Sequence, residues 1–260
     1  MRVHIEAELV YYLAEPTDVL FAVEAIPMRD QRLIYDKLTV AGDATTLRSV
    51  EDHGTPGRRQ WMETTGQTRI SYVADVEVNR APLSIAGLSV PPRRELPADV
   101  ISYLFPSRYC ESDRLEIYAA KEFDGVSGGD QILQMSNWIF EHFDYVPGSS
   151  DATTTATDSF LKRQGVCRDY AHVLISFARA VGVPARMVSV YAPGLNPPDF
   201  HAVVEVWLEG SWHLIDPSRM APEESFVRIT YGRDATDISF MTIFGQADLI
   251  SQTVMVSADS

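Results

Sequence analysis

The chain has 260 residues, of which 45% are hydrophobic and 22% are charged, so it can form a sizeable core and is not globally disordered. Its formal net charge is −14, from 22 basic and 36 acidic residues. This balance argues against nucleic acid or an anionic membrane surface as a partner, because both reward clusters of Lys and Arg. The composition indicates a globular protein with one large domain or two ordinary ones.

The N-terminus and the cysteines indicate a reducing compartment. Glu6 and Glu8 interrupt the start of the chain, where a secretory signal peptide needs an unbroken apolar stretch. No uncharged apolar run approaches the ~18 residues of a membrane helix. Cys110 and Cys167 are too few for a disulfide framework in a chain of this length. We therefore expect a cytoplasmic protein with free thiols and no membrane segment.

The first eighty residues are typical of antiparallel β-structure. Apolar and polar side chains alternate over residues 3–9, which is the period of a half-buried strand. We expect a turn at Pro16–Thr17, and a hairpin at residues 64–67 between strands 60–63 and 70–78. Short strands at this spacing predict a small sandwich-like β domain.

Prolines mark the end of this region. Four of them lie close together: Pro82, Pro91, Pro92 and Pro97. They can continue neither a helix nor a central strand. We therefore predict an N-terminal β domain at residues 1–80, a linker at 81–97 and a core at 98–260.

The core begins with helical patterns and ends with strands. We expect Asp130 to cap one amphipathic helix and Thr157 to cap a short one. A further amphipathic helix is expected to run from Cys167 to Gly182. Beyond it the apolar period changes to two, in three segments: 186–191, 201–208 and 212–216. Helices followed by strands predict an α+β fold.

Cys167 is the first candidate for chemistry because it lies at the expected N-terminus of a helix. There, free N–H groups and partial positive charge stabilise a thiolate. Such a position lowers a cysteine pKa from ~8.5 into roughly 3.5–7.5. The same N–H groups can hold an oxyanion during acyl transfer. A lone cysteine is more often a small buried hydrophobe, and Cys110, with no evident base nearby, is interpreted as one.

A hairpin supplies the partners that a nucleophilic thiol needs. If residues 209–210 form a two-residue turn, His201 and Asp216 become diagonal neighbours on one face. Cys167 would then attack, His201 would accept its proton, and Asp216 would fix the imidazole tautomer. The alternatives are an ordinary hydrogen-bonded histidine and a turn carboxylate.

Five segments resemble, in this order, the core of the bacterial transglutaminase-like superfamily. They are GVCRDYAH at 165–172, ARAVGVPAR at 178–186, HAVVEV at 201–206, WHLIDP at 212–217 and YGRDATDI at 231–238. The resemblance covers about residues 130–245, and residues 1–80 look like the β-rich region that often precedes this core. It implies a papain-like α+β fold, in which the helix bearing the cysteine packs on an antiparallel sheet.

The resemblance also implies thiol-dependent amide chemistry through an acyl-enzyme thioester. The first hypothesis is a peptidase or amidohydrolase acting on a peptide, a protein or a small amide. Transglutaminase-type transfer to an amine and a non-catalytic peptide-binding module are the alternatives. Other members use an upstream aromatic or Gln as second oxyanion donor, and Tyr145 is a weak candidate for it here.

The remaining candidates are interpreted as structural. His172 lies about 140° around the helix from the thiol, and Asp169 suits the helix dipole. Arg233, Asp234 and Asp237 fit an ion-paired turn. The histidines show no metal-ligand spacing, and no phosphate loop or dinucleotide motif occurs. We therefore expect no metal and no cofactor, and the sequence leaves the oligomeric state and the substrate open.

Overall fold

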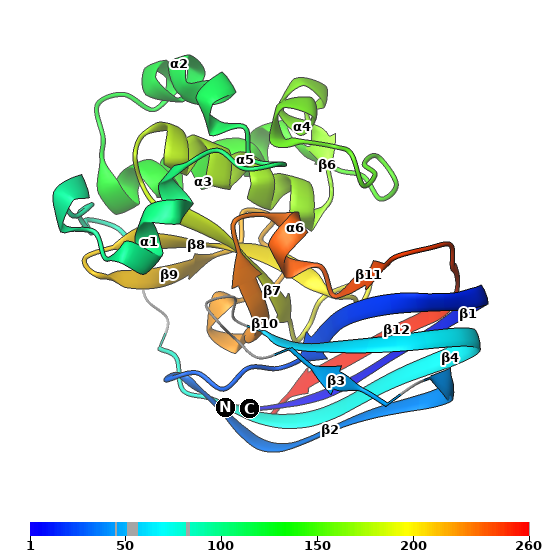
Figure 1. Ribbon diagram of the computed structural model, residues 1–260. Coiled ribbons are helices and arrows are strands. Elements are labelled where there is room, and N and C mark those ends of the chain that lie inside the picture. The colour runs from blue at the N-terminus through cyan, green and yellow to red at the C-terminus, as the bar shows by residue number, and fades with distance from the viewer. Residues whose placement is uncertain (45, 51–56, 82–83, 260) are drawn as a thin grey trace.

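The computed structural model describes residues 1–44, 46–50, 57–81 and 84–259. A sheet of long strands forms the lower part of the molecule in Figure 1, and helices packed on a second sheet form the upper part. The strands within each of these two sheets are antiparallel. The predicted α+β fold with a strand-rich N-terminal region is confirmed.

The lower sheet has six strands and joins both ends of the chain. They are β1 (Arg2–Glu24), β2 (Gln31–Ala44), β3 (Arg48–Ser49), β4 (Arg58–Val78), β11 (Met241–Ile243) and β12 (Asp248–Ala258). β1 pairs with β4 on one side and with β11 and β12 on the other, so the chain ends lie side by side (Figure 1). The predicted boundary between domains 1–80 and 98–260 therefore cuts across this sheet, because residues 241–258 complete it.

The buried face of the lower sheet packs on the upper sheet. The predicted alternation over residues 3–9 is confirmed, since Val3 and Ile5 are fully buried. They share one apolar core with Tyr191 and Ile229 of the upper sheet. The two β layers that we expected within an N-terminal sandwich are therefore the two sheets of the whole molecule.

Our predictions of two breaks in the strands of the lower sheet are wrong. β1 continues through Pro16–Thr17, where we expected a turn, and β4 continues through residues 64–67, where we expected a hairpin. The register shifts here, so that residues 14–16 of β1 lie opposite Thr65 of β4. Such a bulge accommodates a proline and the positive-φ Gly66 without ending the pairing.

Helices cover one side of the upper sheet (Figure 1). The helices that the structure describes are η1 (Arg93–Glu95), α1 (Ala98–Ile101), η2 (Ser102–Leu104), α2 (Ser112–Glu122), α3 (Gly128–His142), α4 (Ala156–Lys162), α5 (Cys167–Ala180), η3 (Glu223–Ser225) and α6 (Ala235–Ile238). Of these, η3 lies on the opposite side, since the adjoining Phe226 packs with Val188 and Val203. The helix predicted to begin at Cys167 is confirmed as α5, whereas α2 was not predicted.

Two helix starts differ from the prediction. Ser127 precedes α3, so Asp130 lies in the first turn of that helix rather than at its cap. α4 is capped by Thr155, whose hydroxyl accepts from the Asp158 backbone N–H while the Asp158 carboxylate accepts from the Thr155 backbone N–H. This reciprocal pair satisfies N–H groups that Thr157, two residues further on and already inside the helix, cannot reach.

The upper sheet carries α5 across one face. Its strands, in spatial order, are β10 (Val227–Gly232), β7 (Ala185–Tyr191), β8 (His201–Leu208) and β9 (Ser211–Ile215). Residues 169–179 of α5 are all buried and share a core with Val204 and Val206 of β8. A short parallel pair, β5 (Asp144–Tyr145) with β6 (Gln164–Gly165), leads into α5. The helix and β8 are therefore rigid supports for whatever their ends carry.

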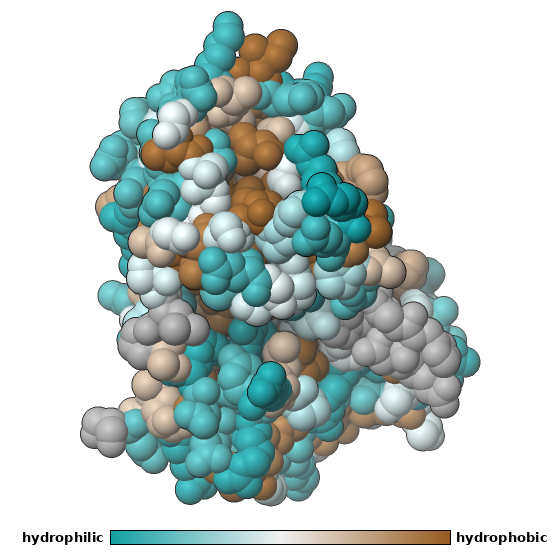
Figure 2. All heavy atoms as spheres, turned by 90° about the vertical axis from the view of Figure 1, so that its left-hand side faces the viewer, coloured by the Kyte–Doolittle hydropathy of each residue, from teal (hydrophilic) through white to brown (hydrophobic). Residues whose placement is uncertain are grey.

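The proline-rich segment that connects the two parts has little regular structure apart from η1. Pro82 of the predicted linker lies outside the described residues. Exposed apolar side chains such as Ile117 remain on the helical body, where Figure 2 shows hydrophobic and hydrophilic patches side by side, as is usual for a folded protein. Within the described ranges, no helix is long and apolar enough to cross a membrane.

Candidate active site

Cys167 is the first residue of α5 and is half-buried. Val166, in an extended conformation, precedes the helix and offers no side-chain acceptor to its first turn. Its carbonyl accepts from the backbone N–H groups of Asp169 and Tyr170, at 2.8 and 3.1 Å. The Cys167 N–H belongs to the first four of the helix, which have no intrahelical acceptor. The thiol therefore lies beside N–H groups and at the positive end of the helix dipole.

The β8–β9 hairpin brings His201 and Asp216 together as predicted. Residues 209–210 form the turn with φ values of 48° and 79°, which fixes the register and pairs Trp207 with Trp212. His201 Nε2 lies 2.9 Å from Asp216 Oδ2, and both side chains are only 1% exposed. A buried imidazole and carboxylate in direct contact form a strong, charge-assisted pair.

Asp216 is held on both carboxylate oxygens. Oδ1 accepts from the backbone N–H and the hydroxyl of Ser218, at 2.9 and 2.6 Å. Oδ2 accepts from the Met220 N–H at 3.1 Å as well as contacting His201. Burial raises the pKa of Asp216, but the bonds from His201 and Ser218 outweigh it and hold the pKa below its usual value. Asp216 thus serves as a turn carboxylate and as the anion beside the imidazole.

The two ring nitrogens of His201 have different surroundings. Nε2 faces Asp216, whereas Nδ1 is buried and has no hydrogen-bond partner within the described part of the chain. Burial lowers the pKa of His201, but Asp216 and the Cys167 thiol act against it and raise the pKa to about 10. The imidazole therefore favours its charged form next to Cys167, and Nδ1 is the nitrogen available to the thiol.

Tyr145 lies beside the thiol, where the sequence placed only a weak candidate. It pairs with Gly165 in the β5–β6 ladder, and its ring lies 5.8 Å from that of Tyr170. Burial and the charge of Cys167 raise the pKa of Tyr145, whose hydroxyl also interacts with the Cys167 backbone N–H. The phenol is therefore protonated at neutral pH and available as a donor next to the thiol.

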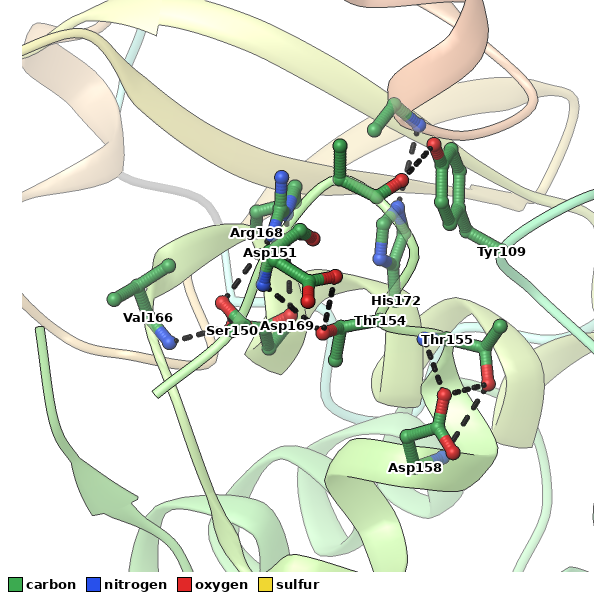
Figure 3. Close-up of polar contacts among 12 residues, drawn as sticks. Tyr109, Ser150, Asp151, Thr154, Thr155, Asp158, Val166, Arg168, Asp169 and His172 are labelled. Atoms are coloured by element: carbon green, nitrogen blue, oxygen red, sulfur yellow. Dashed lines mark hydrogen bonds and ion pairs between the residues drawn. The ribbon is translucent and has the colours of Figure 1, made fainter. Parts of the chain in front are cut away.

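The turn before Cys167 is held by a network that the sequence did not predict (Figure 3). The fully buried Asp169 accepts from the Val166 N–H at 2.8 Å and from the Ser150 hydroxyl at 2.6 Å. The Arg168 guanidinium donates to the Ser150 hydroxyl and to the Asp151 carbonyl, at 3.2 and 2.8 Å. These bonds join the polar loop before α4 to the first turn of α5.

Gly165 leaves room for this network. A Cβ on Gly165 would lie 2.4 Å from the Cβ of Asp169, closer than real contacts allow. Asp169 orders the backbone just before Cys167 through its bond from the Val166 N–H, in line with its structural interpretation. The signal in the sequence was the spacing Gly165–Asp169 around the cysteine, but the partner loop lies too far away along the chain to be recognised.

The other predicted residues lie away from the thiol or inside packed contacts. His172 is fully buried and stacks on Tyr109 with ring centroids 5.2 Å apart. Burial lowers its pKa to about 3, so it is neutral and accepts from the Ala235 N–H at 3.2 Å (Figure 3). Asp234 caps α6, and burial raises the pKa of Cys110 to about 12. These contacts agree with structural roles.

Arg233 and Asp237 form the ion pair that was expected of them. The Arg233 Nε lies 2.8 Å from the Asp237 carboxylate at the end of β10. In the described part of the chain, no three His, Cys, Asp or Glu side chains are arranged to hold a metal ion.

Known proteins share both the sequence and the fold. A sequence model of the transglutaminase-like superfamily matches residues 119–217. A crystal structure from Cytophaga hutchinsonii, named a "Putative Cysteine Protease", superposes with a TM-score of 0.90 and 33% identity, covering 99% of this chain and 90% of that one. The chain belongs to the transglutaminase-like superfamily.

Curated relatives match over shorter stretches. An uncharacterized protein of Mycobacterium leprae is 27% identical over 119 residues, which are 42% of each chain. The protein-glutamine gamma-glutamyltransferase of Pseudomonas aeruginosa is 36% identical over 104 residues, which are 33% of this chain and 16% of that protein. The chain thus spans less than half the length of the curated relatives it matches.

Proposed function

We propose that the chain is a cysteine-dependent peptidase or amidohydrolase that acts through a Cys167–His201–Asp216 triad. The observation that carries this proposal is the buried His201, with Nε2 bound to Asp216 at 2.9 Å and Nδ1 left for the thiol. A module that only binds peptides has no need of a raised imidazole pKa beside a thiol. This argues against the non-catalytic alternative.

The proposed reaction begins with the thiolate of Cys167 attacking the carbonyl carbon of an amide. The C–N bond then breaks, the amine leaves with a proton from the His201 imidazolium, and a thioester forms at Cys167. Water, deprotonated by the now neutral His201, attacks the thioester and releases the acid, which regenerates the thiol. Asp216 keeps the imidazole oriented and stabilises its charge in both halves of the reaction.

Charge on the carbonyl oxygen needs donors in the tetrahedral intermediates. The backbone N–H of Cys167 and the hydroxyl of Tyr145 both lie beside the thiol, and we assign them as oxyanion donors. The protonated phenol supports this assignment for Tyr145, because a phenolate has no hydrogen to donate. No cofactor takes part in the proposed reaction.

Transfer to an amine is the second candidate. It uses the same thioester and differs only in the group that resolves it. The similarity to a protein named protein-glutamine gamma-glutamyltransferase favours this candidate. The half-buried thiol, which water can reach, favours hydrolysis.

One experiment tests the function and separates the two outcomes. The protein is incubated with a tryptic digest of casein, with and without monodansylcadaverine, and the mixture is quenched in acid for mass spectrometry. We expect an acyl adduct on Cys167, together with deamidated or shortened peptides for hydrolysis, or dansylated peptides for transfer. The Cys110→Ala control should behave like the wild type. Products that persist in Cys167→Ala would contradict the proposal.

A further inference from the structure

Asp199 lies two residues before His201, on the loop that leads into β8. Phe200, between them, stacks on Phe240 with ring centroids 4.4 Å apart and also contacts Tyr191, so it points into the core between the sheets. Asp199 and His201 therefore flank a side chain that is held in the core, and only one residue separates the carboxylate from the first residue of β8.

The carboxylate of Asp199 is oriented but not neutralised. Its Oδ1 accepts from the Phe200 N–H at 2.7 Å and from the side-chain amide of Gln252 on β12. Oδ2 accepts no hydrogen bond from the residues that the structure describes, and the side chain is exposed. Partial burial raises the pKa of Asp199 and the charge of His201 acts against this rise, while the charge of Asp199 contributes to the raised pKa of Tyr145. The charge of Asp199 thus acts on the two groups that surround the Cys167 thiol.

Little positive charge is available near this carboxylate to cancel it. Segments 144–152, 192–200 and 248–258, which supply Tyr145, Asp199 and Gln252, contain no Lys or Arg. Arg168, next to the thiol, is bound to the loop before α4. A thiolate–imidazolium pair carries no net charge, so Asp216 and Asp199 make the site negative. A cationic group is attracted to such a site and an anionic one is repelled.

We propose that Asp199 is a specificity-determining residue that selects substrates with a cationic group, an ammonium or a guanidinium, beside the reacting amide. The proposal rests on the function proposed above, because it assigns a substrate class to the thiol of Cys167. The free Oδ2 would accept a hydrogen bond from the cation, while Gln252 keeps the carboxylate in place.

Charged alkylating reagents test this selection without a known substrate. The Cys167 alkylation rate is measured in a Cys110→Ala background with bromoacetamide, anionic bromoacetate and a bromoacetamide bearing a trimethylammonium group. Each rate is divided by the rate at which the same reagent alkylates N-acetylcysteine amide, which corrects for the intrinsic reactivity of the reagent. The wild-type ratio of cationic to neutral rates should exceed one and should fall at high salt. In Asp199→Asn we expect it to fall about fivefold, the size of one interaction between two charges that are exposed to water.

Asp43→Asn is the matched control, since Asp43 is an exposed aspartate on β2, at the far edge of the lower sheet. The ratio of cationic to neutral alkylation rates in Asp43→Asn should equal that of the wild type. If Asp199→Asn also keeps the wild-type ratio while Cys167 still reacts, the role of Asp199 is wrong and the nucleophile stands. If Cys167 reacts with none of the reagents, the proposed nucleophile fails, and the selection that rests on it fails too.

Discussion

Asp216→Asn is expected to reduce turnover by about a thousandfold or more, measured on the casein-derived peptide that the protein processes fastest. The asparagine retains one oxygen, but its amide can turn toward His201 and then stabilises the wrong imidazole tautomer. The pKa of His201 should also fall from about 10, since the bond to Asp216 raises it. The imidazolium needed to protonate the leaving amine would then be lost at lower pH.

His201→Ala should be at least as damaging, because it removes both the base and the acid of the proposed reaction. His213→Ala is the matched control: His213 lies on the same hairpin, and its ring hydrogen-bonds to the Ser211 hydroxyl and the Leu208 carbonyl. Both His201 and Asp216 are buried, so circular dichroism must establish that each variant is folded. A folded Asp216→Asn protein with wild-type turnover would contradict the role of the carboxylate.

Glu205→Gln is expected to lower the free energy of unfolding by about 3–5 kcal/mol. Glu205 on β8 is fully buried and accepts from Arg186 Nε at 2.7 Å and from Arg228 Nε at 2.8 Å. Arg228 also forms an ion pair with Asp30, which lies 2.9 Å away in the connection between β1 and β2. The substitution leaves the buried Arg186 guanidinium with no carboxylate partner among the described residues and Arg228 with Asp30 alone, and it weakens a link between the two sheets.

Urea denaturation measures this effect, with Glu77→Gln as the control. Glu77 forms an ion pair with Arg32 at 2.7 Å, but these side chains are 48% and 70% exposed. Removing that charge should change the stability by less than about 1 kcal/mol. Equal effects of the two substitutions would show that the buried network contributes no more than a surface pair.

Local patterns were sufficient to predict much of the candidate site. The apolar period after Cys167 predicted α5 and its start, and the turn at residues 209–210 determined which side chains face each other across β8 and β9. Both inferences depend on residues close together in the chain. They therefore needed no knowledge of the rest of the fold.

Contacts between distant segments could not be predicted in this way. β12 pairs with β1 from the opposite end of the chain, so the lower sheet appeared complete at residue 80. Glu205 lies in an apolar strand, and nothing nearby in sequence indicated that Arg228 and Asp30 would surround its charge. The bulge at Pro16 was interpreted as a turn for a related reason. Only the partner strand β4 shows that β1 resumes its pairing beyond the bulge.

The alkylation of Cys167 across the pH range tests the central claim most directly. Iodoacetamide rates are measured in a Cys110→Ala background, with and without His201→Ala. Because the pKa of His201 is raised to about 10, the imidazolium persists through neutral pH, and we expect the rate at pH 6 to stay within about threefold of that at pH 8. In His201→Ala, where no imidazolium stabilises the thiolate, the rate should instead fall by more than about tenfold between pH 8 and pH 6. The same steep fall in both proteins would contradict the pairing of Cys167 with His201.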